Sequence, residues 1–164
     1  MSTPTLVAVC GLPGAGKTTV AEEITQRRDA RLLRTDVVRT DLFPDPEYTE
    51  EEAEAVYAEL FERATAALAD GDVVLDATFR TAAFREGART TAAEAGAEFT
   101  LVSVQCDDAT VRRRIRRRTD DESDADIAVY ELFRDTYEPI ANPDLVVDNS
   151  GTLDETFAQL DDAV

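Results

Sequence analysis

Short apolar runs alternate along the chain with segments in which apolar residues recur every three or four positions. The apolar runs lie at residues 6–10, 31–35, 73–79, 99–106 and 145–148, and their length is typical of buried strands, the second run being the weakest. Between them, segments such as residues 53–68 and 127–137 have the spacing of amphipathic helices. This alternation predicts an α/β fold of three layers, in which helices cover both faces of a parallel sheet.

Helix boundaries and domain limits follow from the same pattern. Capping boxes at residues 49–52 and 152–155 predict that helices begin directly after the threonine of each box. The last helix is expected to turn Leu153, Phe157 and Leu160 towards the core. Since no repeat, low-complexity segment or linker interrupts the pattern, residues 1–164 are predicted to form one domain.

The composition indicates the cellular location of the protein. No apolar run approaches the roughly 18 residues of a membrane-spanning helix, and the N-terminus lacks a basic region followed by an apolar segment. Cys10 and Cys106 each end an apolar run, as reduced core cysteines do in a chain without an export signal. These features predict a cytoplasmic protein that does not associate with membranes. The chain has no histidine, which removes the most common general base and metal ligand.

The formal net charge of the chain is −18. A surface this acidic repels polyanions and therefore disfavours nonspecific binding to nucleic acid. The same acidity, with Lys17 as the only lysine among 17 Lys and Arg residues, is also typical of adaptation to high salt. Salt adaptation is a hypothesis here, and strong screening would weaken the electrostatic argument against nucleic acid.

A glycine-rich stretch, residues 11–18, connects the first strand to the first helix and is called the P-loop below. It fits G-x-x-x-x-G-K-[ST], in which glycines let backbone N–H groups turn towards a phosphate at a helix N-terminus. Lys17 is expected to bridge the terminal phosphates of a nucleotide and Thr18 to bind Mg²⁺. The alternative, a plain glycine-rich turn, is disfavoured by the order of strand, loop and helix. The residues expected to contact the nucleotide here are Gly11, Pro13, Gly14, Ala15, Gly16, Lys17, Thr18 and Thr19.

Two carboxylates follow predicted strands, at the edge where α/β folds bind ligands. Asp36 could accept a proton from an attacking hydroxyl or hold water on Mg²⁺, although an aspartate here is equally typical of a helix N-cap. Arg39 would share a helix face with Asp36. Asp76 ends the third strand, where many P-loop proteins hold the water shell of the metal, and Thr78 lies two positions on. Arg85, on the following helix, either reaches substrate or is solvated.

A basic segment, residues 111–118, is predicted to form a helix with two kinds of arginine. At about 100° per residue, Arg114 and Arg118 share a face with Val111 and Ile115, which must turn inward. Such inward arginines suit polyphosphate or the face of adenine. The other four arginines are expected to pair with acids of residues 120–126 or to meet water. Because residues 119–126 are polar and hinge-like, a short lid is predicted over about residues 112–128.

In this order, the motifs resemble those of small P-loop kinases. This family includes zeta-toxin-like and gluconate-kinase-like proteins, related AAA-type ATPases, and the kinase domain of bacteriophage polynucleotide kinase. The segments that carry the resemblance beyond the P-loop are residues 36–39, residues 74–79 followed by Arg85, the pair Arg114 and Arg118 followed by residues 123–125 and 137–140, and residues 147–150. The resemblance implies a P-loop NTPase fold with a five-stranded parallel sheet in the order 2-3-1-4-5.

The resemblance also implies roles for the matched residues. Asp36 matches the carboxylate that receives the acceptor hydroxyl, Arg39 an arginine that contacts substrate or phosphate, and Asp76 an acid that touches metal-bound water or substrate. Arg114 and Arg118 match lid arginines that embrace adenine and the transferring phosphoryl. Asn149 and Ser150 lie where the family packs adenine.

The sequence therefore predicts a phosphotransferase that uses ATP and Mg²⁺ and moves the γ-phosphoryl to a hydroxyl of a small molecule. Asp36, Asp76, Thr78, Arg39 and Arg85 are the expected substrate residues, and Thr18 and Asp76 the metal residues; which aspartate is the main base stays open. One alternative is a kinase of 5′-hydroxyl polynucleotides or nucleosides, which the net charge opposes. Another is a regulatory switch that hydrolyses ATP slowly and has no acceptor pocket.

Overall fold

The sheet at the centre of the molecule is fully parallel. The computed structural model describes residues 3–47, 49–118 and 123–161, without the side chains of residue 118 and residues 123–126. Its five strands lie in the order β2-β3-β1-β4-β5, which confirms the order that the resemblance to P-loop kinases implies. The strands are β1 (Thr5–Cys10), β2 (Arg31–Arg34), β3 (Val73–Asp76), β4 (Glu98–Gln105) and β5 (Leu145–Asp148).

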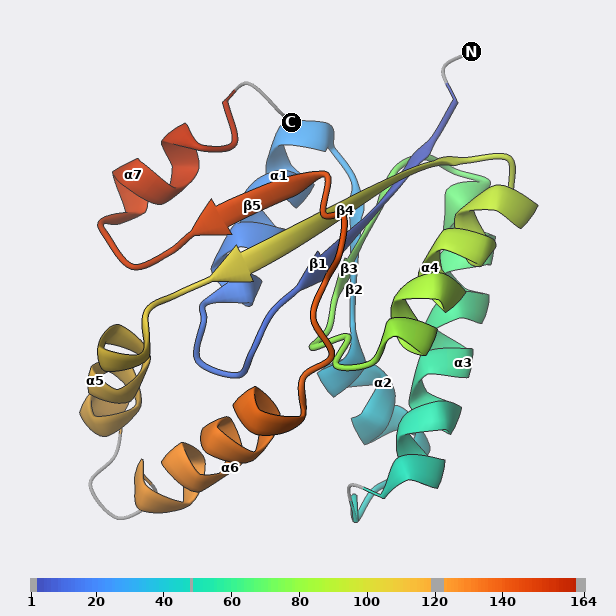
Figure 1. The fold of residues 1–164 in the computed structure, drawn as a ribbon. Coiled ribbons are helices and arrows are strands. Elements are labelled where there is room, and N and C mark those ends of the chain that lie inside the picture. The colour runs from blue at the N-terminus through green and yellow to red at the C-terminus, as the bar shows by residue number, and fades with distance from the viewer. Residues whose placement is uncertain (1–2, 48, 119–122, 162–164) are drawn as a thin grey trace.

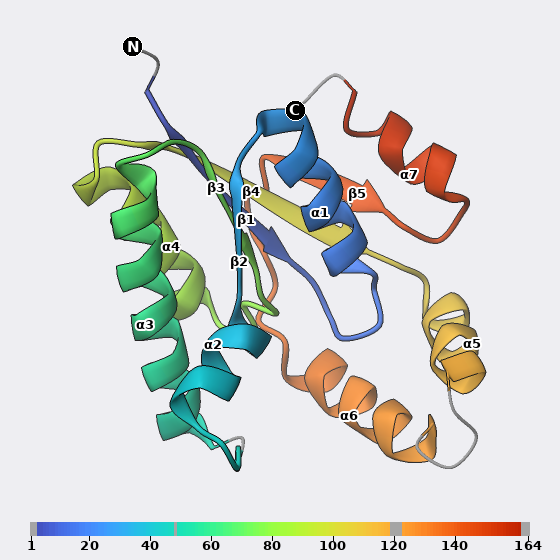
Figure 2. The same cartoon turned by 180° about the vertical axis from the view of Figure 1, so that it is seen from behind.

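Helices cover both faces of the sheet, which gives the predicted three layers (Figures 1 and 2). Helices α1 (Lys17–Arg28) and α7 (Leu153–Ala158) lie on one face, and α3 (Glu50–Leu68) and α4 (Ala82–Glu94) on the other. Helices α2 (Thr35–Leu42), α5 (Asp108–Arg118) and α6 (Ser123–Thr136) lie beyond the carboxyl ends of the strands, where the site is built (Figure 1).

The side chains of β1 alternate between two cores. Leu6 and Ala8 pack with α3 and α4, whereas Val7 and Val9 pack with α1. A strand that is buried on both faces has a continuous apolar sequence, which explains why the apolar run at residues 6–10 predicts β1. None of the described helices combines the length and apolarity needed to cross a membrane.

The last helix differs from its prediction in one residue. Leu153 is the first residue of α7 and is 56% exposed, so the expectation that it turns inward is wrong. Thr152 caps the helix as predicted, by accepting a hydrogen bond from the N–H of Glu155. The cap places Leu153 in the first turn on the solvent side, whereas Leu160, just beyond the helix, is fully buried as predicted.

The turn after β3 depends on a tyrosine hydroxyl. Phe79 is buried and has a φ of 50°, a left-handed conformation that is uncommon for a residue other than glycine. Its N–H donates a 2.9 Å hydrogen bond to the hydroxyl of Tyr57 on α3. This bond satisfies a buried backbone donor that the strained turn leaves without a strand partner.

Replacing Tyr57 by phenylalanine is therefore expected to destabilise the protein. Tyr57→Phe keeps the ring but leaves the buried N–H of Phe79 without its acceptor, so the free energy of unfolding should fall by about 1–3 kcal/mol. Thr65→Ala on the same helix is the control, because the exposed Thr65 hydroxyl donates only to the Phe61 carbonyl, and its effect should stay within about 0.5 kcal/mol. Equal urea midpoints for the two variants would contradict this account.

Candidate active site

The P-loop wraps the N-terminus of α1. Gly14 and Gly16 have φ values of 86° and 84°, left-handed conformations that glycine adopts without strain. Gly16 is the N-cap of α1, and no described side chain caps this helix. The N–H groups of the first turn, together with the positive end of the helix dipole, therefore face the space in front of the loop and suit an anion.

Asn149 holds the P-loop from behind. Its Nδ2 donates a 2.8 Å hydrogen bond to the carbonyl of Ala15, and its Oδ1 accepts a 2.7 Å hydrogen bond from the hydroxyl of Thr156. A Cβ atom at Gly16 would lie 2.1 Å from Asn149 Nδ2. Only glycine therefore permits this close approach, and a chain of buried hydrogen bonds runs from α7 to the loop.

Asn149 also connects the P-loop to helix α5. Arg114 donates from Nη2 to the carbonyl of Asn149 at 2.7 Å, and its Nη1 lies 3.5 Å from Cys106 Sγ. Arg114 turns inward as predicted, beside the buried Val111 and Ile115. Asn149 and Ser150 were predicted on the adenine side, but Asn149 uses its side chain inside the protein, and Ser150 Oγ accepts a hydrogen bond from the N–H of Asp107.

A buried carboxylate meets the P-loop at the end of β3. Asp76 has a side chain that is 3% exposed, and its Oδ2 accepts a 2.7 Å hydrogen bond from the hydroxyl of Thr18. The same oxygen accepts a 3.1 Å hydrogen bond from Arg34 Nε, at the end of β2. The structure thus brings together the two residues predicted to bind the metal and adds a cation beside them.

Asp36 lies next to this group and is open to solvent. Its side chain is 84% exposed, and its Oδ2 lies 3.7 Å from Arg34 Nη2. The alternative that Asp36 caps α2 is wrong, because the helix begins at Thr35 and Arg34 is its N-cap. Asp36 is instead in the first turn, where the helix dipole favours its charge.

Arg39 pairs with a residue of α3 and not with Asp36, with which it was expected to share a helix face. Its guanidinium pairs with the carboxylate of Glu52 on α3, and both side chains are largely buried. Glu52 Oε2 also accepts a hydrogen bond from the N–H of Glu47. Asp36 and Arg39 therefore contact different residues, Arg34 and Glu52 respectively. The positive charge of Arg39 is balanced within the protein.

Arg85 is buried, so the alternative that it is solvated is wrong. Its guanidinium donates hydrogen bonds to the carbonyls of Phe79, Glu138 and Pro139 at 2.7, 2.8 and 3.2 Å. Nearby, the Thr78 carbonyl accepts a 2.6 Å hydrogen bond from the hydroxyl of Tyr137. These bonds fasten the loop after β3 to the segment that follows α6.

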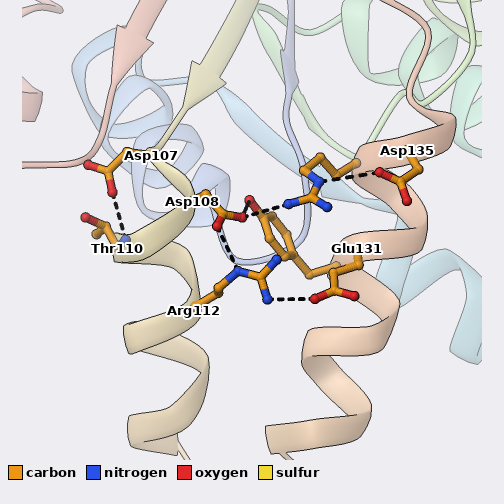
Figure 3. Close-up of polar contacts among 8 residues, drawn as sticks. Asp107, Asp108, Thr110, Arg112, Glu131 and Asp135 are labelled. Carbon is orange, nitrogen blue, oxygen red and sulfur yellow. Dashed lines mark hydrogen bonds and ion pairs between the residues drawn. The ribbon is translucent and has the colours of Figure 1, made fainter.

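An ionic network joins the N-terminal half of α5 to the C-terminal half of α6 (Figure 3). Arg112 pairs with Asp108 at 2.8 Å and with Glu131 at 2.6 Å. The acids of residues 120–126, which the sequence offers as partners of these arginines, have side chains outside the described part of the chain. Asp108 also accepts hydrogen bonds from the Tyr130 hydroxyl at 2.9 Å and from Arg134 at 3.0 Å. The hydrogen bond from Arg112, above all, lowers the pKa of the Asp108 carboxyl below its ordinary value. The two helices are therefore linked at the start of the predicted lid, while the side chain of Arg118 lies outside the described residues.

A cavity of about 450 Å³ lies between the P-loop, the carboxyl end of β4 and α6. Leu12, Gln105, Tyr130 and Tyr137 are among its lining residues, and none of the lining residues in the described part of the chain is charged. A mostly apolar lining of this kind suits an uncharged part of a ligand. Burial raises the pKa of Cys10 to about 12 and also raises that of Cys106, so both cysteines stay thiols at neutral pH.

The sheet order and the loop between β1 and α1 define a P-loop NTPase fold. A family model described as an AAA domain matches residues 6–140, and the chain belongs to this family. No curated protein matches the chain.

Several solved structures share the fold over nearly the whole chain. A complex of the Mycobacterium tuberculosis APS kinase CysC with AMPPNP and APS has a TM-score of 0.79 and 24% identity, over 99% of this chain and 98% of that one. A gluconokinase from Sinorhizobium meliloti 1021 has a TM-score of 0.75 and 19% identity, over 97% and 90% of the two chains. A sugar kinase from Janibacter sp. HTCC2649 has a TM-score of 0.70 and 16% identity, over 99% and 96%.

Sequence reasoning missed Arg34 and Glu52 as residues of the site. Arg34 is the last residue of β2 and lies beside Asp76 in the parallel register of β2 and β3. A charged residue that ends a strand, two positions before a candidate carboxylate, was the available signal. The sequence indicated Glu52 only as part of a capping box, whereas its carboxylate forms an ion pair with Arg39.

Removing the side-chain amide of Asn149 is expected to weaken nucleotide binding. Asn149→Ala leaves the Ala15 carbonyl and the Thr156 hydroxyl without this partner, so the P-loop loses its preset conformation, and the Kd for ADP should rise about tenfold. Titration calorimetry measures this change. Asn142→Ala, at an exposed position between α6 and β5, is the control and should leave the Kd unchanged. An unchanged Kd for Asn149→Ala would show that the loop does not depend on this bond.

Proposed function

We propose that the protein transfers the γ-phosphoryl of ATP to a hydroxyl of a small molecule. The observation that carries this proposal is the meeting of Thr18, Asp76 and Arg34 with an exposed second carboxylate, Asp36, at the mouth of the P-loop. A nucleotide hydrolase needs a positioned water, whereas an exposed carboxylate beside the phosphate site suits an acceptor hydroxyl. The solved structures with the same fold include kinases, which supports the same reading.

The residues at the mouth of the loop fit Mg²⁺. The Thr18 hydroxyl and the Asp76 carboxylate supply the hard oxygen ligands that this ion prefers. Within the described residues no group of three or more His, Cys, Asp or Glu side chains could hold a metal alone. Mg²⁺ suits such a site, because it keeps several waters and is shared with substrate phosphates. Bound there, it would neutralise charge on the β- and γ-phosphates.

The two aspartates are assigned different roles on the basis of their surroundings. Asp76 is buried and already accepts hydrogen bonds from Thr18 and Arg34, which suits a residue of the metal shell. Asp36 is exposed and lies beside this group, so an acceptor could reach it, and it would orient or deprotonate the attacking hydroxyl. Lys17 would hold the terminal phosphates, and Arg114 and Arg118 would neutralise charge on the transferring phosphoryl.

The acceptor is proposed to be a small molecule in the cytoplasm. The net charge of −18 opposes a nucleic-acid end as the acceptor. Arg39, the arginine that the resemblance assigns to substrate, is paired with Glu52. The cavity beside the loop is lined by uncharged side chains in its described part, and it could take a neutral portion of the acceptor.

Replacing Asp36 is expected to abolish transfer. With γ-³²P-labelled ATP, Mg²⁺ and high salt, wild type should label a component of pooled metabolites, and Asp36→Asn should reduce that labelling by at least about 100-fold because general-base catalysis is lost. Asp41→Asn on the same helix is the matched control, since Asp41 pairs with Arg63 away from the site, and should retain activity. A label found only in 5′-hydroxyl oligonucleotides would favour the polynucleotide alternative. Slow release of phosphate that is unaffected by Asp36→Asn would favour the switch and contradict the proposal.

Arg118 is expected to act on the transferring phosphoryl. Arg118→Ala should lower kcat on the order of 10³-fold, as for other arginines that stabilise a loose phosphoryl-transfer transition state, with little change in the KM for ATP. Arg117→Ala, one residue away and exposed on α5, should change kcat little. Turnover of Arg118→Ala within a few-fold of wild type would remove this role.

A further inference from the structure

We propose that Arg34 is an internal cation that balances Asp76 in the metal-free protein and moves to Asp36 when a divalent cation binds at Thr18 and Asp76. This inference rests on the metal site of the proposed function. It adds a residue that the metal ligands alone do not explain. In this role Arg34 is a positioning residue, because it acts on the two aspartates and does not touch the reacting atoms.

The guanidinium of Arg34 lies close to three polar side chains of the site. Nε lies 3.1 Å from Asp76 Oδ2, and Nη2 lies 3.5 Å from Thr18 Oγ1. The same Nη2 lies 3.7 Å from Asp36 Oδ2. One planar group thus spans the buried carboxylate, the P-loop hydroxyl and the exposed carboxylate.

Charge balance explains why a cation is needed here in the absence of metal. The Asp76 side chain is 3% exposed, and a buried carboxylate without a counter-charge is strongly destabilising. Arg34 supplies that charge. A divalent cation held by the same carboxylate would face the guanidinium at a few ångströms, where like charges repel strongly in a partly buried site. The two cations therefore compete for Asp76.

The surroundings of Arg34 allow it to move. Its side chain is 35% exposed, and β2 is the edge strand of the sheet, so the guanidinium can turn outward without displacing a neighbouring strand. Asp36 lies on the open side, within ion-pair distance of Nη2. Metal binding would strengthen the pairing of Arg34 with Asp36 and so fix the carboxylate that receives the acceptor. Arg34 thereby couples occupation of the metal site to the orientation of Asp36.

Binding of Mn²⁺ to the ADP complex tests this competition without any turnover. Free Mn²⁺ is measured by electron paramagnetic resonance during titration. Arg34→Gln removes the competing charge, so it should bind Mn²⁺ about tenfold more tightly than wild type. Arg34→Lys keeps the charge and should stay within about threefold of wild type. Arg31→Gln, an exposed residue at the start of the same strand, should leave Mn²⁺ binding unchanged.

A second variant gives an effect of opposite sign and keeps the test open if Arg34→Gln does not fold. Asp36→Asn removes the alternative partner of Arg34 and holds the guanidinium on Asp76, so Mn²⁺ binding should weaken several-fold. Asp36 is highly exposed, and this variant is expected to fold. Unchanged or weaker Mn²⁺ binding in Arg34→Gln, or unchanged binding in Asp36→Asn, would overturn the inference.

Asp76→Asn separates this inference from the proposed function. It should weaken Mn²⁺ binding strongly if Asp76 belongs to the metal site. Full Mn²⁺ affinity in Asp76→Asn would contradict the metal assignment itself, and the inference would fall with it. Weak binding in Asp76→Asn together with wild-type affinity in Arg34→Gln would overturn only the role of Arg34.

Discussion

The buried negative charge of Asp76 is the constraint around which the site is built. A carboxylate at the end of an interior strand must be neutralised and hydrogen-bonded, or it costs several kcal/mol. Parallel strands β2, β3 and β1 end at the same edge, which brings Arg34 and the P-loop threonine Thr18 to this one carboxylate. The sheet order 2-3-1 therefore determines which residues can neutralise and hydrogen-bond Asp76, and it also places Asp36 beside them.

A second set of bonds fixes the loop from the opposite edge of the sheet. Asn149 follows β5 and reaches the carbonyl of Ala15, while its own carbonyl receives Arg114 from α5. The P-loop is thus held between β3 on one side and β5 on the other. Helix α5 shares the second anchor, so a displacement of α5 would reach the P-loop through the hydrogen bonds of Arg114 and Asn149. Because these bonds hold the P-loop in place, its backbone N–H groups would need little reorganisation to bind a phosphate.

The sequence was sufficient for the elements and for the loop, because strand runs, capping boxes and the P-loop pattern are local signals. The confirmed order of the sheet came from the resemblance of the motifs. The partners of charged side chains were not predictable in the same way. Arg34 meets Asp76 only through the register of two strands, and Arg112 meets Glu131 only through the packing of α5 against α6. The exposure of Leu153 and the burial of Arg85 were not predictable for the same reason, since exposure depends on how an element packs in the fold. The assigned roles of the site residues stay predictions.

The central claim is that the γ-phosphoryl passes directly to an acceptor hydroxyl beside Asp36. Reaction of ATP in water labelled with ¹⁸O, followed by ³¹P nuclear magnetic resonance, distinguishes the two possible attacking groups. The account predicts a phosphate ester that carries no ¹⁸O in its phosphoryl group, since water does not attack. Inorganic phosphate that carries ¹⁸O, as the sole product in the presence of pooled metabolites, would contradict it and identify the protein as a hydrolase.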